Sequence, residues 1–279
     1  MQDFFKSLSS VLALALILAS CTNIDIREED AFDVKRTIDP RYFESSDYSL
    51  EEIRFAAADG LELEGWFISR AGNERTVLFI GGNGFVIAAS YYIITSIIEQ
   101  DVDLMVFNFR GYGTNPGSPT VEGVKADVEG AYRYLTEQRG VPPAELILHG
   151  HSLGSILAAG AANRHPVAAV VLESPLTDAK DLTSRLVPWI LKPFVRFTVD
   201  PALLTVSNYE EVPKITVPVL FITGGADNVT PQEMAEELYD AAETDDKRLH
   251  ILQGGGHNDL PEREDYRKLL REFYHNAPK

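Results

Sequence analysis

The sequence predicts an α/β protein, with a mostly parallel central sheet covered by helices on both faces and a small helical cap. Short apolar segments typical of buried strands alternate with segments whose apolar residues recur at helical spacing. Most of these strand segments are apolar throughout, which indicates a sheet that is covered on both faces. With 279 residues, 45% of them apolar, the chain suits one large domain with a substantial core.

Eight segments are predicted to be strands, and the first two form a hairpin. Ile53–Ala56 and Leu61–Ser69 flank Asp59-Gly60, which is a strong turn signal between alternating apolar residues. This hairpin is expected to add an antiparallel edge to the parallel sheet. The later strands are short apolar runs, namely Thr76–Ile80, Leu104–Phe109, Leu146–His149, Ala168–Leu172, Val219–Thr223 and His250–Leu252.

Helices are predicted between these strands. Thr120 is the expected N-cap of a helix over Val121–Gln138, because threonine accepts hydrogen bonds from the first helical turn. Thr230-Pro231 has the N-cap and first-turn residues of a helix over Pro231–Ala242. The other predicted helices are Ala88–Glu99, Ser152–Asn163 and Glu264–Tyr274.

Composition and charge exclude several classes of function. The formal net charge is −17, whereas nucleic-acid binding requires a basic surface that meets the phosphates. Cys21 is the only cysteine, so neither an intramolecular disulfide nor a cysteine-rich zinc site can form. The sequence contains no HExxH metalloprotease pattern and no P-loop. No nucleic-acid partner, metal or organic cofactor is therefore expected.

The first twenty residues have the features of an export signal. Lys6 and the free amino terminus precede the apolar run VLALALILA at 11–19. This run is short for a membrane-spanning helix but suits the apolar core of a signal peptide. The sequence Leu-Ala-Ser-Cys at 18–21 resembles the lipobox of bacterial lipoproteins, whose cysteine is diacylated and becomes the new N-terminus. An ordinary secretory signal with an incidental cysteine is the alternative.

The lipobox resemblance implies an organisation for the whole chain. Residues 1–20 would be a lipoprotein signal peptide, 21–49 a charged tether, and 50–279 the folded domain. Lipid chains on Cys21 would anchor the protein to a membrane of the bacterial cell envelope, because two or more chains bind a bilayer stably. Thr22 follows the cysteine, and by resemblance to the sorting rule of enteric bacteria it favours the outer membrane. The expected location is thus the periplasmic side of an envelope membrane.

The most specific motif in the domain runs from Gly150 to Gly154 and reads GHSLG, a match to the nucleophile elbow G-x-S-x-G. The apolar strand LILH leads directly into it and the helix SLGSILAAG follows, which is the context that this motif requires. The elbow places the oxygen of Ser152 at the end of the strand in a strained turn, and the flanking glycines avoid clashes. A serine between glycines in an ordinary loop is the alternative.

From about Leu50 to the C-terminus, the sequence resembles the α/β-hydrolase superfamily. The segments GGNG, FRGYG, GHSLG, LESPLTD, GGAD and GGGHND occur in that order. The set is most similar to the branch that contains serine-aminopeptidase-like hydrolases and the protein depalmitoylases with their bacterial relatives. The resemblance implies the α/β-hydrolase fold and a triad in the chain order serine, acid, histidine, with Ser152 as the nucleophile.

The same resemblance implies the other two members of the triad. Asp227 stands at the family's G-x-x-D position after the strand Val219–Thr223, where its carboxylate would orient the histidine. His257 follows the last strand in a glycine-rich loop that can bring its ring to Ser152 as the base. A turn residue that caps the next helix is the alternative for Asp227. The weaker candidates for the acid are Asp178, Asp200 and Asp259.

Two backbone N–H groups are expected to form the oxyanion hole. One belongs to Leu153, next to the nucleophile, and the resemblance gives Asn83 as the other, in the loop Gly81–Gly84. The family usually has His-Gly where this loop has Gly-Gly, so a side chain that braces the loop is missing. The segment FRGYG at 109–113 lacks the glycine spacing of a nucleotide-binding loop and is expected to line the site.

The segment at about 176–213 is long for a connection within a domain and is predicted to form the small cap over the site. Its apolar residues suit either packing on the core or an acyl pocket or membrane-facing lid. They are Leu186, Val187, Trp189, Ile190, Leu191, Phe194, Val195 and Phe197. If one helix continued through Pro188 and Pro193, then Arg185, Lys192 and Arg196 would share a face that could meet an anionic head group.

The sequence thus predicts a membrane-tethered serine hydrolase that cleaves a small-molecule or lipid acyl ester or thioester through an acyl-enzyme. One alternative is an aminopeptidase-like peptide hydrolase with the same triad, which must recognise a free amine and would be helped by an acidic pair near the cap. The other is a catalytically silent lipoprotein that binds a lipid or a partner, and the complete triad argues against it.

Overall fold

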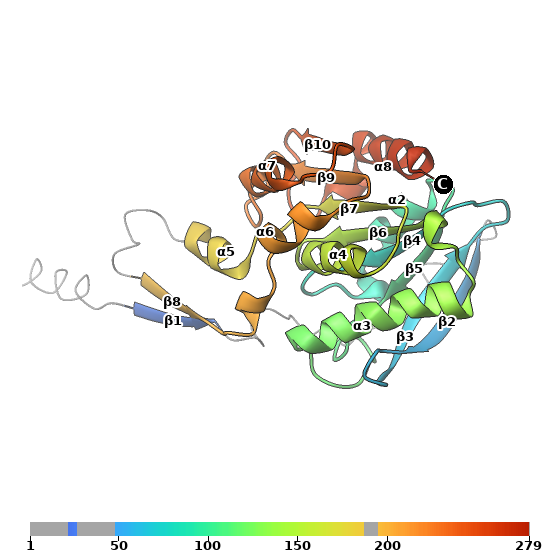
Figure 1. Cartoon of the computed structure of the whole chain (residues 1–279), viewed down its shortest axis with the longest axis horizontal. Coiled ribbons are helices and arrows are strands. Elements are labelled where there is room, and N and C mark those ends of the chain that lie inside the picture. Colours follow the sequence, from blue (N-terminus) through green and yellow to red (C-terminus); the bar gives the residue numbers. More distant parts are fainter. Residues whose placement is uncertain (1–21, 27–47, 187–194, 279) are drawn as a thin grey trace, which may run out of the picture.

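The computed structural model describes residues 22–26, 48–186 and 195–278, and its main feature is a sheet of eight strands with helices on both faces (Figure 1). The strand order is β10-β9-β7-β6-β4-β5-β3-β2. The strands are β2 (Ser49–Ala56), β3 (Glu62–Ser69), β4 (Thr76–Ile80), β5 (Asp103–Phe107), β6 (Leu146–His151), β7 (Ala169–Glu173), β9 (Val219–Gly224) and β10 (Lys247–Leu252).

The six strands from β10 to β5 are parallel, and β3 and β2 complete the sheet as an antiparallel edge. The predicted hairpin is therefore confirmed. Its turn spans residues 57–61, where the N–H of Ala57 donates to the carbonyl of Leu61 at 2.8 Å and Gly60 has a φ of +88°. The left-handed conformation of Gly60 is the one that a glycine in this turn allows at little cost.

Two groups of helices cover the two faces of the sheet. On one face lie α3 (Val121–Arg133), α4 (Leu153–Arg164) and α7 (Gln232–Ala241), and on the other lie α2 (Tyr91–Ile98) and α8 (Glu264–Asn276) (Figure 1). Each face has its own apolar core, and both cores include residues of the central strands. This burial on both sides explains why the central strands are apolar throughout.

The helices predicted from Val121 and Glu264 begin at those residues, whereas two other predicted helix starts were wrong. The hydroxyl of Thr120 accepts the N–H of Gly123 at 3.0 Å, so Thr120 is the N-cap of α3. Thr230 does not cap α7, because its hydroxyl bonds to Asp227 instead, and the helix begins only at Gln232. The helix predicted from residue 88 begins at Tyr91, after a short 3-10 turn.

The predicted cap segment contains several short elements. They are α5 (Ala179–Leu186), β8 (Val195–Val199), η6 (Leu203–Thr205), α6 (Asn208–Glu211) and η7 (Val212–Lys214). Leu176, Leu203 and Val206 form a small apolar cluster with Ile156 of α4 and Met234 of α7. The described part of this segment therefore contacts α4 at its start, through this cluster, and near its end, where Asn163 bonds to Glu211 of α6.

The predicted cationic face across the cap segment does not form as one helix. Arg185 lies near the end of α5, whereas Arg196 lies in strand β8. Arg185 pairs instead with Asp181 and Glu237, each at 2.8 Å. Lys192, Val187, Trp189, Ile190, Leu191 and Phe194 lie outside the described residues.

Only one part of the N-terminal segment is described. Strand β1 (Thr22–Ile26), which falls in the predicted tether, pairs in parallel with β8. Cys21 and the signal sequence lie outside the described residues, so lipidation, anchoring and location in the cell envelope stay predictions, as do the domain boundaries. Among the residues that are described, no helix has the length and apolar character needed to cross a membrane.

Candidate active site

The nucleophile elbow joins β6 to α4 with Ser152 in a strained backbone conformation, at φ +54° and ψ −118°. The two flanking glycines are required by close packing. A Cβ atom at Gly150 would lie 2.3 Å from the carbonyl oxygen of Gly154, and one at Gly154 would lie 2.0 Å from that of Ile80. No side chain fits at these distances, so the turn can form only with glycine at both positions.

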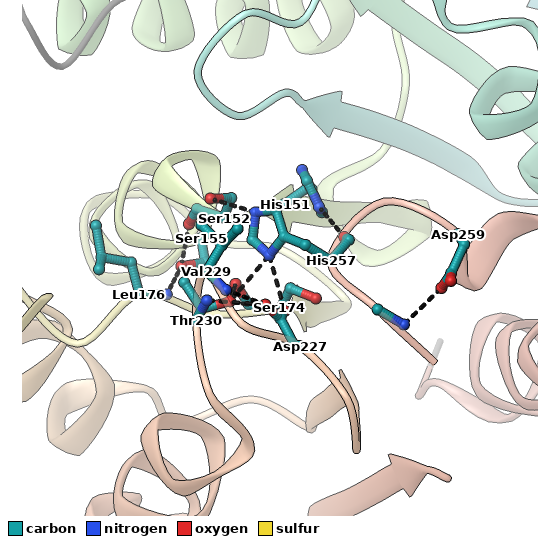
Figure 2. A network of polar contacts seen from close by, with 11 residues as sticks. His151, Ser152, Ser155, Ser174, Leu176, Asp227, Val229, Thr230, His257 and Asp259 are labelled. Atoms are coloured by element: carbon teal, nitrogen blue, oxygen red, sulfur yellow. Dashed lines mark hydrogen bonds and ion pairs between the residues drawn. The ribbon is translucent and has the colours of Figure 1, made fainter. Parts of the chain in front are cut away.

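Ser152, His257 and Asp227 come together although more than a hundred residues separate the first from the second (Figure 2). The Ser152 Oγ lies 3.1 Å from His257 Nε2, and His257 Nδ1 lies 2.7 Å from Asp227 Oδ2. Asp227 follows β9 and His257 follows β10. Because parallel strands end at the same edge of the sheet, the three loops meet there.

The environment of Asp227 determines the direction of these hydrogen bonds. Burial alone would raise the pKa of Asp227, but the hydrogen bond from His257 and the N–H groups of Thr230 and Val229 outweigh it and lower that pKa. An ionised carboxylate only accepts, so the proton of the imidazole must be on Nδ1. Nε2 of the neutral ring is then an acceptor for the hydroxyl of Ser152.

Thr230 is a member of this site that sequence reasoning assigned to a helix cap. Its hydroxyl lies 3.0 Å from Asp227 Oδ2, 3.0 Å from the carbonyl of Ser174, and 3.1 Å from His257 Nδ1 (Figure 2). Its backbone N–H donates to Asp227 Oδ1 at 2.9 Å. Thr230 therefore holds the carboxylate in place from two sides, and its position three residues after Asp227 is the only signal of this in the sequence.

The three weaker candidates for the acid each have a local backbone partner. Asp178 accepts the N–H of Asp181 at 2.7 Å, Asp200 that of Ala202 at 2.8 Å, and Asp259 that of Gly256 at 2.7 Å. In the described part of the chain, none of the three hydrogen-bonds to His257. The geometry therefore favours Asp227 over all of them.

His151, the variable position of the elbow motif, connects the elbow to the loop of the histidine. Its Nε2 lies 3.1 Å from the backbone carbonyl of His257, and the two rings are 5.0 Å apart (Figure 2). Burial lowers the pKa of His151 and favours the neutral ring. Since a carbonyl only accepts, Nε2 of His151 must carry the proton that is donated to it.

A second polar network lies buried at the base of the elbow. Glu173, the last residue of β7, is 2.9 Å from His149 Nε2 and accepts the hydroxyl of Tyr266 at 2.7 Å. The hydroxyl of Tyr274 lies 2.7 Å from His149 Nδ1. The backbone carbonyl of Glu173 accepts the N–H of Ser152 at 2.9 Å, which joins this network to the nucleophile. A glutamate at the end of the apolar run AVVLE is the signal that sequence reasoning passed over.

Replacing Glu173 with glutamine should destabilise the fold by about 2 kcal/mol at pH 7, because charge-assisted hydrogen bonds are lost in a buried site. Burial would raise the pKa of Glu173, but the hydrogen bond from His149, the nearby His151 and Tyr266 outweigh it and lower that pKa. A carboxyl group whose pKa is lowered by folding stabilises the protein at pH values above its unfolded pKa of 4.5. This stabilisation is lost as the pH falls through the folded pKa. The difference should therefore shrink below pH 4.5 in urea unfolding.

The matched control for this change is Glu272→Gln, which removes the same charge from an exposed position of α8. We expect it to alter the free energy of unfolding by no more than about 0.5 kcal/mol. Equal effects of the two substitutions at pH 7 would contradict a stabilising role for Glu173.

The oxyanion loop, which we define as residues 81–84, leaves β4 and passes directly beside the nucleophile. A Cβ atom at Gly82 would lie 3.0 Å from the Cβ of Ser152, so the peptide between Gly82 and Asn83 borders the reacting centre. Leu153 begins α4, and its N–H has no acceptor within the helix. Both predicted N–H donors thus belong to segments that adjoin Ser152, where they could stabilise a developing negative charge.

The described residues contain no group of three or more histidine, cysteine, aspartate or glutamate side chains placed to hold a metal ion.

The fold and the arrangement of the site define the chain as an α/β-hydrolase. The profile of the serine aminopeptidase S33 family of hydrolases matches residues 72–205 and 192–264. The chain therefore belongs to this family, as the resemblance in its motifs predicted.

The chain is also similar to several known proteins. An uncharacterized protein of Mycobacterium tuberculosis strain H37Rv is 34% identical over 214 residues, covering 76% of this chain and 73% of its own length. The uncharacterized protein YfhR of Salmonella typhi is 31% identical over 224 residues, covering 73% of each. The structure of an esterase from Pyrococcus furiosus superposes with a TM-score of 0.73 at 18% identity, covering 89% of this chain and 99% of that one. This structural likeness confirms the α/β-hydrolase fold.

Proposed function

We propose that the protein is a serine hydrolase that cleaves carboxylic esters or thioesters through an acyl-enzyme. The observation that carries the proposal is the continuous chain of hydrogen bonds from Ser152 through His257 to Asp227, at 3.1 and 2.7 Å. A hydroxyl is a weak nucleophile until an adjacent base removes its proton, and this arrangement provides that base together with its orienting acid. Membership of a hydrolase family supports the same reaction class.

In the proposed reaction, the Ser152 oxygen attacks the carbonyl carbon of the substrate while its proton passes to His257 Nε2. The carbonyl oxygen becomes negatively charged and accepts hydrogen bonds from the N–H groups of Asn83 and Leu153. When the carbon–oxygen or carbon–sulfur bond to the leaving group breaks, His257 gives its proton to that group. A water molecule then attacks the acyl-enzyme with His257 again as the base, which releases the carboxylic acid and restores Ser152.

An observation near the cap segment favours esters over peptides with a free amino terminus. An aminopeptidase must pair the amine of its substrate with carboxylates, and Asp181 and Glu237 are a candidate pair. Both already pair with Arg185, each at 2.8 Å. The phenol of Tyr209 also donates to Glu237. Arg185 offsets one of the two negative charges of this pair and occupies both carboxylates, which makes them less available to an amine.

A cavity of about 180 Å³ borders the oxyanion loop and supports a short acyl group as part of the substrate. The loop forms one wall, Tyr92 and Ile93 of α2 form another, and His151 and Asn258 close the side toward the histidine loop. A water-sized group occupies about 30 Å³, so this space holds about six non-hydrogen atoms. The proposal is that the acyl chain enters this cavity.

Tyr92→Ala should shift the preference toward longer chains, because it removes a wall of the cavity. For p-nitrophenyl esters, we expect the ratio of kcat/KM for octanoate over acetate to rise by about tenfold, as expected for a few added methylenes. Tyr91→Ala is the matched control, since Tyr91 is the neighbouring exposed tyrosine and does not line the cavity. If both variants kept the wild-type ratio, the acyl chain would have to bind elsewhere.

The function itself is tested with p-nitrophenyl esters and acyl thioesters from acetyl to palmitoyl, using the purified protein. Hydrolysis that requires Ser152 is the expected result. If a folded protein hydrolysed none of these substrates, peptide substrates or a silent binding role would have to replace the proposal.

A further inference from the structure

The oxyanion loop has little of its own that fixes its position. Gly81, Gly82 and Gly84 have no side chains, and Gly84 has a φ of +75°. Side chains are excluded where the loop passes its neighbours, since a Cβ atom at Gly81 would lie 2.3 Å from the side chain of Phe85. Glycine is the residue with the greatest conformational freedom. The N–H groups of the loop must therefore be held in place by contacts from outside it.

One such contact comes from Tyr112, in the segment FRGYG that follows β5. The hydroxyl of Tyr112 donates to Asn83 Oδ1 at 3.1 Å. The side chain of Tyr112 is completely buried, and its ring packs edge-on against Phe109 with the centroids 6.1 Å apart. A ring enclosed in this way presents its hydroxyl at one point in space, so it can fix the position of the exposed Asn83.

The segment that carries Tyr112 is itself tied to the rest of the domain. The guanidinium of Arg110 pairs with Asp127 of α3 at 2.6 Å and with Asp59 of the hairpin turn at 2.7 Å. Asn108, which precedes this segment, accepts the N–H of Ile87 at 3.0 Å, shortly after the oxyanion loop. Tyr112 thus contacts the oxyanion loop itself, and the neighbouring Asn108 contacts the chain just beyond that loop. The ion pairs of Arg110 hold this part of the chain in place.

We propose that Tyr112 is a positioning residue for the oxyanion hole, and this inference rests on the proposed hydrolase function. Tyr112 acts through Asn83 and does not touch the reacting atoms. The bracing side chain that Gly81 lacks is supplied from another loop of the fold. An oxyanion donor contributes only if it meets the developing charge at about 2.7–3.1 Å, so a loosened loop loses part of its effect.

The test is Tyr112→Phe, which keeps the buried ring and removes only the hydroxyl. We expect kcat for p-nitrophenyl acetate to fall by ~10-fold, a fraction of the ~10²–10³ lost with a whole oxyanion donor. KM should stay within about twofold, and the pH profile of kcat/KM should not move, because the interaction lost acts mainly in the transition state. Tyr132→Phe is the matched control. The hydroxyl of Tyr132, in α3, donates to the backbone carbonyl of Pro166, and its removal should leave kcat unchanged.

A second variant tests whether Tyr112 acts through Asn83. Asn83→Ala removes the acceptor but keeps the backbone N–H, and the double variant should be no slower than the slower single variant. Hydrogen exchange of the peptide 81–86 provides a readout that does not depend on turnover. It should be faster in Tyr112→Phe than in the wild type, and unchanged in Tyr132→Phe.

The possible failures can be told apart. If the wild type hydrolyses esters through Ser152 but Tyr112→Phe keeps its kcat, or if the losses in the double variant multiply, the positioning role is overturned. If the wild type hydrolyses no substrate, the proposed function fails first. Hydrogen exchange of the peptide 81–86 then tests by itself whether Tyr112 positions the loop. An exchange rate that is unchanged in Tyr112→Phe would overturn the positioning role as well.

Discussion

Ser152→Ala is expected to lower kcat/KM for ester hydrolysis by ~10⁴–10⁶-fold, the range found when the nucleophile of a triad is removed. The substitution deletes the oxygen that lies 3.1 Å from His257 Nε2, so no acyl-enzyme can form. Only binding and the oxyanion hole would then accelerate the attack of water. The measurement is the initial rate with p-nitrophenyl acetate, beside the midpoint of thermal unfolding.

Ser155→Ala is the matched control for this prediction. The hydroxyl of Ser155 donates to the backbone carbonyl of Ser152 at 2.6 Å, so it supports the elbow without reaching the triad. The same hydroxyl accepts the N–H groups of Leu176 and Asn208, so the variant should be less stable by about 1 kcal/mol for each lost hydrogen bond. Because the triad is intact, its kcat/KM should fall by less than about tenfold. A fluorophosphonate probe should label Ser152 in the wild type and in this variant. Activity that survived in Ser152→Ala would show that another group is the nucleophile.

Asp227→Asn should lower kcat by ~10⁴-fold, as expected when the acid of a triad becomes an amide. The amide nitrogen would face His257 Nδ1 across 2.7 Å and donate a hydrogen bond to it. The imidazole would then carry its proton on Nε2, where it can no longer accept the proton of Ser152. Because the pKa of Asp227 is lowered, the wild-type carboxylate is ionised throughout the neutral range and keeps the productive tautomer.

Asp259→Asn makes the same chemical change within the loop of the histidine. Asp259 accepts the N–H of Gly256 at 2.7 Å and was a weaker candidate for the acid. We expect less than about tenfold loss in kcat for this variant, because a single loop hydrogen bond is weakened. The assignment of the acid would be wrong if Asp259→Asn were the more damaging of the two, or if Asp227→Asn left kcat near the wild-type value.

These expectations depend on supporting contacts that the motif patterns do not specify. Thr230 holds the carboxylate of Asp227 by its hydroxyl and its backbone N–H. His151 donates to the carbonyl of His257, which links the elbow to the histidine loop. Each of these contacts restrains Asp227 or His257 at the position that the proposed reaction requires. A catalytic site needs such supporting contacts in addition to the catalytic residues themselves.

The sequence by itself predicted most elements of the sheet and the three residues that the structure brings together at the site. Strands such as Thr76–Ile80 and the elbow around Ser152 are specified by the residues within them, through apolar runs, glycines and turn signals. Asp227 and His257 were found because the motif order of the superfamily places an acid and a histidine after successive strands. A face shared by Arg185 and Arg196 required one helix to continue past two prolines, and this condition is not met, because Arg185 lies in α5 and Arg196 in β8.

The tertiary structure decided which side chains support the site. Tyr112 meets Asn83 across 29 residues of sequence, Glu173 meets Tyr266 across 93, and His151 reaches the carbonyl of His257 across 106. The order of strands in the sheet also differs from their order in the chain: β4 lies between β6 and β5 in the sheet, whereas β5 lies between β4 and β6 in the sequence. Local patterns specify each strand and each turn, but not which strands become neighbours. The partners of buried polar groups therefore appear only when the sheet is assembled.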